Sequence, residues 1–275
     1  MSSERVEEFY EQNPFPYFDP EDIDSRDDLY RMIGEFEKAL DRAIPQDSKI
    51  LVAGCGTGIL ANFLAISGRD VFAIDLSQES IDTARSVKKN LEIEEVEFKQ
   101  KNITDLDTSQ SYDLVISLGV LHHLSKPQEG FRVISECLKD GYIVLGLYNK
   151  YGRIRTKARK VLFRLTGNRF KRMDPYLRKQ SLDAKRSEIF FNDQYRHPNE
   201  FSFSIGDIIS WFEEQQIDFR RCIPSQKRFK GQKQDLNLFK TTRKPSLLAK
   251  IKLQTRWFLN EAEGNGYFIM IGQKE

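Results

Sequence analysis

The sequence has few cysteines and no long apolar run, and each shortage excludes a class of protein. Cys55, Cys137 and Cys222 are widely spaced and odd in number, so they form neither a disulfide framework nor a zinc-binding pattern. We expect them to be small buried side chains. No stretch approaches the roughly 18 apolar residues of a membrane span, and no hydrophobic segment follows the initial MSSERVEEFY. We therefore predict a soluble, cytoplasmic protein.

Charge is nearly balanced overall but unevenly distributed. The 275 residues carry a formal net charge of +2, yet residues 150–186 hold 14 Lys and Arg against 2 Asp and Glu. Residues 227–256 hold 10 against 1, and the remainder is acidic. Such basic segments favour an anionic partner: nucleic acid, an anionic membrane surface or an anionic small substrate. A solvated helix surface is the plainer alternative.

Strand-like and helix-like runs alternate regularly along most of the chain. The predicted strands are residues 48–54, 70–76, 95–102, 112–118, 141–148, 217–225 and 266–274, and the helices between them are 59–68, 77–90, 127–138 and 204–216. Repetition of strand, crossover helix and strand predicts a mostly parallel sheet covered on both faces. The fold class is therefore α/β, a doubly wound seven-stranded sheet, with a helical insert after the fifth strand and a second insert after the sixth.

Three glycines, Gly54, Gly56 and Gly58, follow the first predicted strand in LVAGCGTGIL. A turn at this place lies at the carboxyl edge, where open α/β sheets bind ligands, and glycine lets the backbone approach a ligand closely. The dinucleotide fingerprint places its third glycine three residues after the second, where this chain has Ile59. The pattern indicates a nucleotide-like ligand and argues against NAD.

Polar residues end the next two strands. Asp75 follows the glycines by about 20 residues, the position from which a carboxylate accepts hydrogen bonds from ribose hydroxyls. Capping of the following helix is the alternative role for Asp75. Asn102 and Ile103 follow the third strand, where an amide and an apolar side chain can flank an adenine ring; an ordinary polar loop is the alternative there.

The stretches ILVAGCGTG, VFAIDLS, KNITDLD and YDLVISLGVLHHLSKP resemble, in order and spacing, the successive motifs of class I S-adenosylmethionine-dependent methyltransferases. The resemblance covers Lys49 to about Tyr148. It implies a Rossmann-like methyltransferase fold with an antiparallel last strand, S-adenosyl-L-methionine as cofactor and S-adenosyl-L-homocysteine as product. The cofactor-binding residues that it implies are Gly54, Cys55, Gly56, Gly58, Asp75, Leu76, Asn102, Ile103, Ser117 and Leu118.

One residue departs from the family pattern. An acidic residue usually stands two positions before the first glycine, and this chain has Val52. The departure implies weaker cofactor binding or a contact from elsewhere. The remaining stretches FYEQNPFPYF, GLYNKYGR and NDQYRHPNEFSFSIGDI resemble a subgroup of bacterial and archaeal methyltransferases, some of them fused to tetratricopeptide repeats.

We divide the chain into an N-terminal helical or lid segment (1–46), a cofactor-binding core (47–149), a basic helical cap (150–203) and a C-terminal part that completes the sheet (204–275). The aromatic FYEQNPFPYF is predicted to close over the site, or alternatively to cover a sheet edge. In-line methyl transfer chiefly requires positioning, with a base only where the nucleophile carries a proton. Histidine is the natural base. The candidate catalytic residues are Tyr10, Tyr17, His122, His123, Tyr195 and His197.

These observations predict a methyltransferase that acts on a small or lipid-like molecule, with an anionic substrate among the candidates. An RNA methyltransferase, acting on tRNA or rRNA through the basic segments 150–186 and 227–256, stays open. So does a catalytically silent cofactor-binding partner protein, because of Val52. No cluster has metal-ligand spacing, so we predict no metal.

Overall fold

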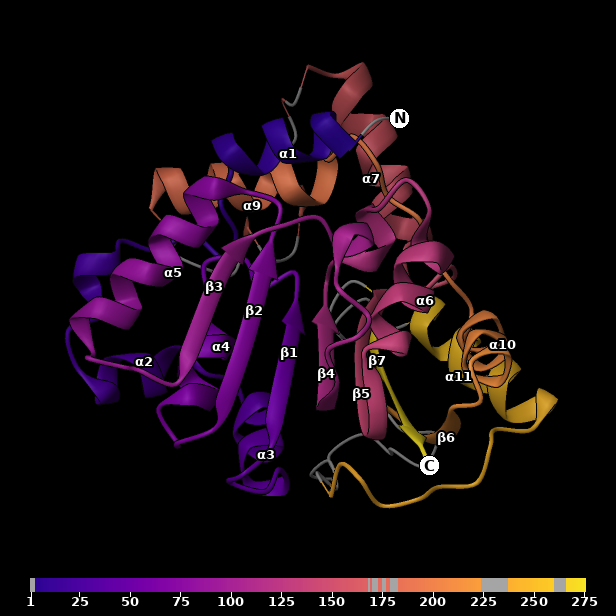
Figure 1. The fold of residues 1–275 in the computed structure, drawn as a ribbon. Helices are drawn as coiled ribbons and strands as arrows, with labels where there is room; N and C mark the ends of the chain where they lie inside the picture. The colour runs from indigo at the N-terminus through magenta and orange to yellow at the C-terminus, as the bar shows by residue number, and fades with distance from the viewer. Residues whose placement is uncertain are drawn as a thin grey trace.

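A seven-stranded sheet forms the centre of the protein in the computed structural model, which describes residues 3–167, 169, 173–174, 177–178, 183–223, 237–259 and 266–275 (Figure 1). The strands are β1 (Lys49–Ala53), β2 (Asp70–Asp75), β3 (Val96–Gln100), β4 (Tyr112–Leu118), β5 (Leu138–Tyr148), β6 (Asp218–Ile223) and β7 (Tyr267–Lys274). Their order is β3-β2-β1-β4-β5-β7-β6. Strands β1 to β5 pair in parallel, and β7 lies antiparallel between β5 and β6. The predicted fold class, including the antiparallel last strand, is confirmed.

Helices cover both faces because the central strands are apolar on both sides. Along β1, Ile50 and Val52 pack into one core, while Leu51 and Ala53 pack into the other. The first core is covered by α2 (Arg26–Met32), α3 (Glu35–Ala43), α4 (Ile59–Ala65) and α5 (Gln78–Asn90). The second is covered by α6 (Pro127–Glu136), α10 (Ile205–Glu214) and α11 (Leu247–Leu259).

Helix ends follow local capping chemistry. The Ser77 side chain accepts a hydrogen bond from the Ser80 amide at 3.1 Å, as expected for the first residue before α5. Helix α4 ends at Ala65, earlier than the predicted end at Gly68, because the chain turns and the Gly68 amide bonds to the Ala65 oxygen at 2.7 Å. Three short 3₁₀ helices span Pro20–Asp22, Ile103–Asp105 and Leu121–His123.

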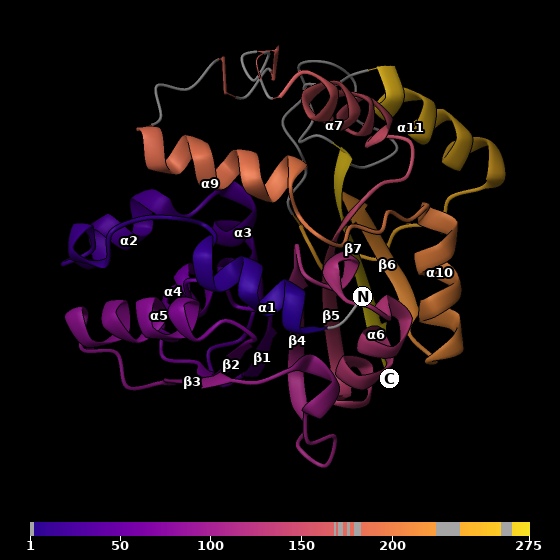
Figure 2. The same ribbon diagram turned by 90° about the horizontal axis from the view of Figure 1, so that it is seen from above.

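Two segments outside the sheet lie across its carboxyl edge. Helix α1 (Ser3–Gln12) and helix α9 (Ala184–Tyr195) cross above the ends of the parallel strands (Figures 1 and 2). Helix α7 (Ile154–Leu165) follows β5 and packs on α9, with Phe163 of α7 clustered against Phe191 and Tyr195 of α9. Parts of both basic segments, including residues 227–236, lie outside the described residues. Among the helices that the structure describes, none is both long and apolar enough to traverse a bilayer.

Candidate active site

A cavity of about 430 Å³ lies at the carboxyl edge, between the strand ends below and helices α1 and α9 above. Its volume falls in the range of about 300 to 1,000 Å³ typical of ligand pockets. Most of the predicted cofactor-binding residues line it, namely Gly54, Cys55, Gly56, Asp75, Leu76, Asn102, Ile103 and Leu118. The structure places Gly58 and the buried Ser117 next to the cavity wall but outside its lining.

The glycine loop leaves no room for side chains. Gly54 and Gly56 have φ of +82° and +51°, in the left-handed region. A Cβ on Gly54 would lie 2.3 Å from a methyl carbon of Val120, and one on Gly56 would lie 2.3 Å from the Phe15 carbonyl oxygen. The bare backbone therefore faces both the cavity and the N-terminal segment.

Gly58 serves a different purpose from the other two glycines. A Cβ there would lie 2.3 Å from the Cβ of Ala84 and 3.2 Å from a ring carbon of Phe98. Gly58 therefore allows the start of α4 to pack closely against α5, and its role is in packing rather than in lining the cavity.

Asp75 orders the loop from below. Its carboxylate accepts hydrogen bonds from the Gly56 amide at 2.8 Å and the Ser77 amide at 3.0 Å. Burial raises the pKa of Asp75, and the two amide contacts oppose that shift. Each carboxylate oxygen retains a second lone pair, so Asp75 can still accept ribose hydroxyls. Val52, where the family usually has an acidic residue, packs in the core.

Asn102 and Ile103 line the next part of the cavity. The Asn102 side-chain oxygen accepts a hydrogen bond from the Thr104 amide at 3.1 Å, which fixes the amide plane at the start of a 3₁₀ helix. Ile103 is nearly fully buried. The arrangement presents a fixed amide beside an apolar side chain, as an adenine ring would require.

The N-terminal segment closes the top of the cavity and is held there by two contacts. The Glu11 carboxylate accepts hydrogen bonds from the backbone amides of Gln78 and Glu79, at 2.5 and 3.2 Å, at the start of α5. Thr57 donates a hydrogen bond to the Pro16 carbonyl at 2.9 Å. Acidic side chains are favoured at a helix N-terminus, so the first contact is stabilising. The segment shields the site from water.

Three histidines lie together at the cavity wall: the adjacent His122 and His123, and His197 from a distant part of the sequence. The ring centroids of His123 and His197 are 3.6 Å apart, and those of His122 and His123 are 4.1 Å apart. His123 alone of the three lines the cavity. Its Nδ1 lies 2.8 Å from the backbone oxygen of Asn199, so Nδ1 carries the proton and the ring lone pair is on Nε2.

Burial makes these rings neutral. It lowers the pKa of His123 to about 4 and that of His197 to about 2. The pKa of His122 falls well below its ordinary value of 6.5, first through burial and then through the neighbouring His123 and Arg153. At neutral pH all three are therefore uncharged, and His123 is available as a hydrogen-bond or proton acceptor.

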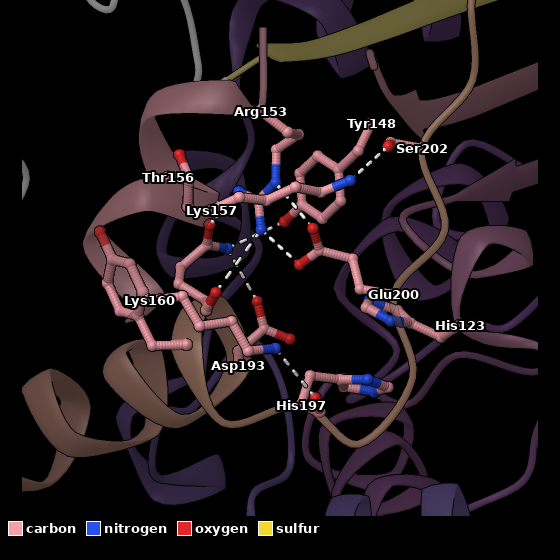
Figure 3. A network of polar contacts seen from close by, with 12 residues as sticks. His123, Tyr148, Arg153, Thr156, Lys157, Lys160, Asp193, His197, Glu200 and Ser202 are labelled. Carbon is pink, nitrogen blue, oxygen red and sulfur yellow. Dashed lines mark hydrogen bonds and ion pairs between the residues drawn. The ribbon is translucent and has the colours of Figure 1, made fainter. Parts of the chain in front are cut away.

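Opposite the histidines, a buried arginine organises the cavity wall (Figure 3). The Arg153 guanidinium forms an ion pair with Glu200 at 2.5 Å and donates to the Gln194 side-chain oxygen at 2.7 Å. With its oxygen fixed in this way, Gln194 turns its NH₂ group to donate to Tyr148 Oη at 2.8 Å and to Asp193 at 2.9 Å. Tyr148, Asp193 and Gln194 all line the cavity.

Tyr10 of α1 completes this wall. Its hydroxyl donates to the Asp193 carboxylate at 3.4 Å, and both residues line the cavity. Burial raises the pKa of Asp193 to about 6, while hydrogen bonding to Gln194 opposes the shift. Sequence reasoning missed Tyr148, Arg153 and Gln194. The position of Tyr148 at the carboxyl end of β5 is a signal that could have revealed it.

Two predicted catalytic tyrosines lie elsewhere. Tyr195 faces α7, where its hydroxyl donates to Asp174 at 2.5 Å and accepts from Arg159 at 2.9 Å. Tyr17 lies against Lys185, whose Nζ is 4.3 Å from the ring centroid. The structure therefore brings Tyr10 and His123 to the cavity, stacks His122 and His197 behind it, and leaves Tyr17 and Tyr195 outside.

Comparison with known proteins agrees with this geometry. A family model described as a methyltransferase domain matches residues 44–173. Residues 44–173 of the chain are thus similar to a methyltransferase domain. The resemblance predicted from the sequence is thus confirmed, because the matched segment holds the glycine loop, Asp75 and the histidine pair.

Individual relatives match only part of the chain. A ubiquinone biosynthesis O-methyltransferase of Rickettsia conorii is 33% identical over 103 residues, 37% of this chain and 35% of that protein. An uncharacterized protein of Synechococcus is 25% identical over 200 residues, 62% of this chain and 47% of that protein. The chain thus spans between about a third and a half of the length of these relatives.

Solved structures share the fold at low sequence identity. PKMT2 from Rickettsia typhi aligns with a TM-score of 0.62 at 15% identity, over 87% of this chain and 52% of that one. Magnesium protoporphyrin IX methyltransferase of Synechocystis, with bound SAH, aligns with a TM-score of 0.53 at 15% identity, over 99% and 94% of the two chains. These similarities establish the fold.

Proposed function

We propose that the protein is an S-adenosylmethionine-dependent methyltransferase whose acceptor is a small or lipid-like molecule. The observation that carries the proposal is one continuous cavity with two chemically different ends. The glycine loop, Asp75 and Asn102 form one end, and Tyr10, His123 and Asp193 form the other. The magnesium protoporphyrin IX methyltransferase of Synechocystis binds SAH and SAM, which supports the same cofactor here.

The residues at the first end fit this cofactor. Gly54 and Gly56 have no side chain to obstruct it, Asp75 has lone pairs for the ribose hydroxyls, and Asn102 with Ile103 suits the adenine. When bound there, the cofactor would supply a methyl group activated by a positively charged sulfur. A lone pair of the acceptor takes the methyl carbon as the carbon–sulfur bond breaks, and the sulfur leaves as a neutral thioether.

The protein's own contribution at the second end is orientation and proton acceptance. The neutral His123 can accept a hydrogen bond from an acceptor O–H or N–H through Nε2, since Nδ1 is held by Asn199. Asp193, fixed between Tyr10 and Gln194, offers a second acceptor of hydrogen bonds. Helix α1 excludes water from the reacting groups.

A small acceptor suits the enclosure better than a polymer. The cavity is covered by α1 and by α9, whose Phe190, Asp193 and Gln194 form part of its lining. A nucleic-acid base or a protein side chain would need this cover to open. The names of several curated relatives, ubiquinone biosynthesis O-methyltransferases, support an acceptor that is small and apolar in part.

The test is transfer of a labelled methyl group. The purified chain is incubated with methyl-labelled S-adenosylmethionine and a cell extract separated into small-molecule, lipid, RNA and protein fractions. We expect label in the small-molecule or lipid fraction, and its loss with His123→Gln. Label in RNA would favour the RNA methyltransferase instead. Cofactor binding by calorimetry with no label in any fraction would favour a silent partner protein.

A further inference from the structure

Exposed apolar side chains are concentrated on two helices at the periphery of the cap. Among the residues that the structure describes, α7 and α11 carry the exposed residues Ile154, Val161, Leu165, Leu247, Leu248, Ile251 and Phe258. The exposed fraction reaches 79% for Leu165 and 78% for Leu248. Single exposed apolar residues are ordinary, whereas a contiguous set marks an interaction site.

On α7 these residues form a stripe that faces away from the protein. Ile154, Val161 and Leu165 stand at positions i, i+7 and i+11, which share one side of an α-helix. The buried residues Thr156 and Phe163 occupy the opposite side. Helix α7 therefore has a buried side, which packs on the protein, and an exposed apolar side, which does not.

Basic side chains flank this stripe. Helix α7 has five basic residues and no acidic one. Arg159 and Lys160 turn inward, where they donate to Tyr195 and to the His197 carbonyl. Arg155 lies on one side of the stripe, and the exposed Lys157 and Arg164 lie on the other.

Helix α11 extends the same surface. Leu247, Ile251 and Phe258 share its outer side, at positions i, i+4 and i+11, while Leu253 and Trp257 are buried on the other side. The first turn of α7 meets the last turn of α11, because the Arg155 guanidinium lies 5.8 Å from the centroid of the Phe258 ring. We call the exposed apolar residues of both helices, with Arg155, Lys157 and Arg164, the α7–α11 surface.

We propose that the α7–α11 surface docks on an anionic lipid bilayer. Aliphatic side chains that project outward between arginine and lysine suit the boundary between acyl chains and anionic headgroups. Single-stranded RNA would favour exposed aromatic rings for stacking, whereas the exposed apolar residues of this surface are aliphatic except for Phe258. The proposal goes beyond methyl transfer and does not depend on it.

Helix α7 of this surface belongs to the same cap (150–203) as α9, which walls part of the cavity. Helix α7 packs on α9 through Phe163 and Phe191, and α9 supplies Phe190, Asp193 and Gln194 to the cavity. A bilayer bound to α7 would thus lie beside the element that walls the acceptor end. This arrangement would bring the enzyme close to membrane-dissolved acceptors.

The test is cosedimentation of the full chain with lipid vesicles. We expect binding to phosphatidylcholine vesicles that contain phosphatidylglycerol, weaker binding to phosphatidylcholine alone, and a decrease with added salt. Val161→Ser with Leu165→Ser should lower the partition coefficient on the anionic vesicles about tenfold or more. Met32→Ser, which alters an exposed apolar residue on α2, should leave it unchanged. Calorimetric binding of S-adenosylhomocysteine checks that each variant is folded.

Four results would overturn the proposal. Wild-type protein that does not bind anionic vesicles rules out the docking, whatever its methyltransferase activity. Vesicle binding that the double variant retains would assign it to another surface. A wild-type dimer in sedimentation that is absent in the double variant would make the surface an interface for a second copy. Binding to poly(U) RNA that is tighter than vesicle binding and competes with it would make the surface a nucleic-acid interface.

Discussion

The Glu11 side chain joins helix α1 to the first turn of α5, accepting the Gln78 amide at 2.5 Å and the Glu79 amide at 3.2 Å. Ser77 caps the same turn, so two side chains satisfy amides that would otherwise have no partner within the helix. Because α5 begins directly after Asp75, this contact ties the cover of the cavity to the strand end that carries its carboxylate.

Glu11→Ala should loosen the cover. Loss of a charged cap contact costs about 1 kcal/mol, so we expect S-adenosylhomocysteine to bind roughly fivefold more weakly. Calorimetry measures this, with the exposed Glu8→Ala as the matched control. Equal affinity in both variants would mean that the contact does not hold the cover closed. Deletion of residues 1–18 tests the cover as a whole. Unchanged turnover in a folded deletion variant would show that this segment is not a lid.

Asp75→Ala should weaken cofactor binding more strongly. The substitution removes the acceptor for the Gly56 amide and for the ribose, a loss of about 1 to 3 kcal/mol for a charged partner. Titration calorimetry with S-adenosylhomocysteine should show this difference against Asp70→Ala, at the exposed opposite end of β2. An unchanged dissociation constant would refute the ribose role.

Gly58→Ala should destabilise the fold. The new Cβ would meet Ala84 at 2.3 Å, which adds about 1 to 3 kcal/mol of overpacking to the strain of a φ of +79°. Gly68→Ala is the control, because its φ is +87° and no atom lies within 4 Å of the added Cβ. Urea unfolding should show a larger loss for Gly58→Ala, and equal losses would show that packing against α5 is not limiting.

His123→Gln and Tyr195→Phe should separate chemistry from stability. If His123 accepts the acceptor's proton, its loss lowers kcat by about 10²- to 10⁴-fold while cofactor affinity persists. Tyr195 bonds to Asp174 and Arg159 away from the cavity, so its variant should lose about 1 to 3 kcal/mol of stability and keep its kcat. A fall in kcat with Tyr195→Phe but not with His123→Gln would contradict the assignment of the reaction to the cavity end that holds His123.

Asp193 should make stability fall as pH rises. Its pKa is about 6 in the folded protein against an ordinary 3.8, so the folded state binds the proton more tightly than the unfolded chain. Between pH 4 and 6 the free energy of unfolding therefore decreases, by about 1 to 3 kcal/mol from this group. Asp193→Asn should abolish this decrease in urea titrations across that range, and Asp70→Asn should not. Parallel pH curves for wild type and Asp193→Asn would contradict it.

The fold and the cofactor end of the cavity were predictable because local signals specify them. Strand periodicity gave the seven strands, and a glycine loop after the first strand lies at the carboxyl edge in any parallel sheet. Asp75, Asn102 and Ile103 each follow a strand end, so strand order alone brings them together. The antiparallel last strand came from family resemblance.

The acceptor end depended on contacts that sequence spacing does not encode. The sequence by itself identified Tyr10, Tyr17, His122, His123, Tyr195 and His197 as candidates, because all lie in motifs or near strand ends. Only the packing of α1 and α9 over the sheet decided that Tyr10 and His123 line the cavity while Tyr195 turns to α7. The buried Arg153 orients Gln194, which lies 41 residues later in the sequence, through a side-chain hydrogen bond. Such a contact exists only once the helices have packed.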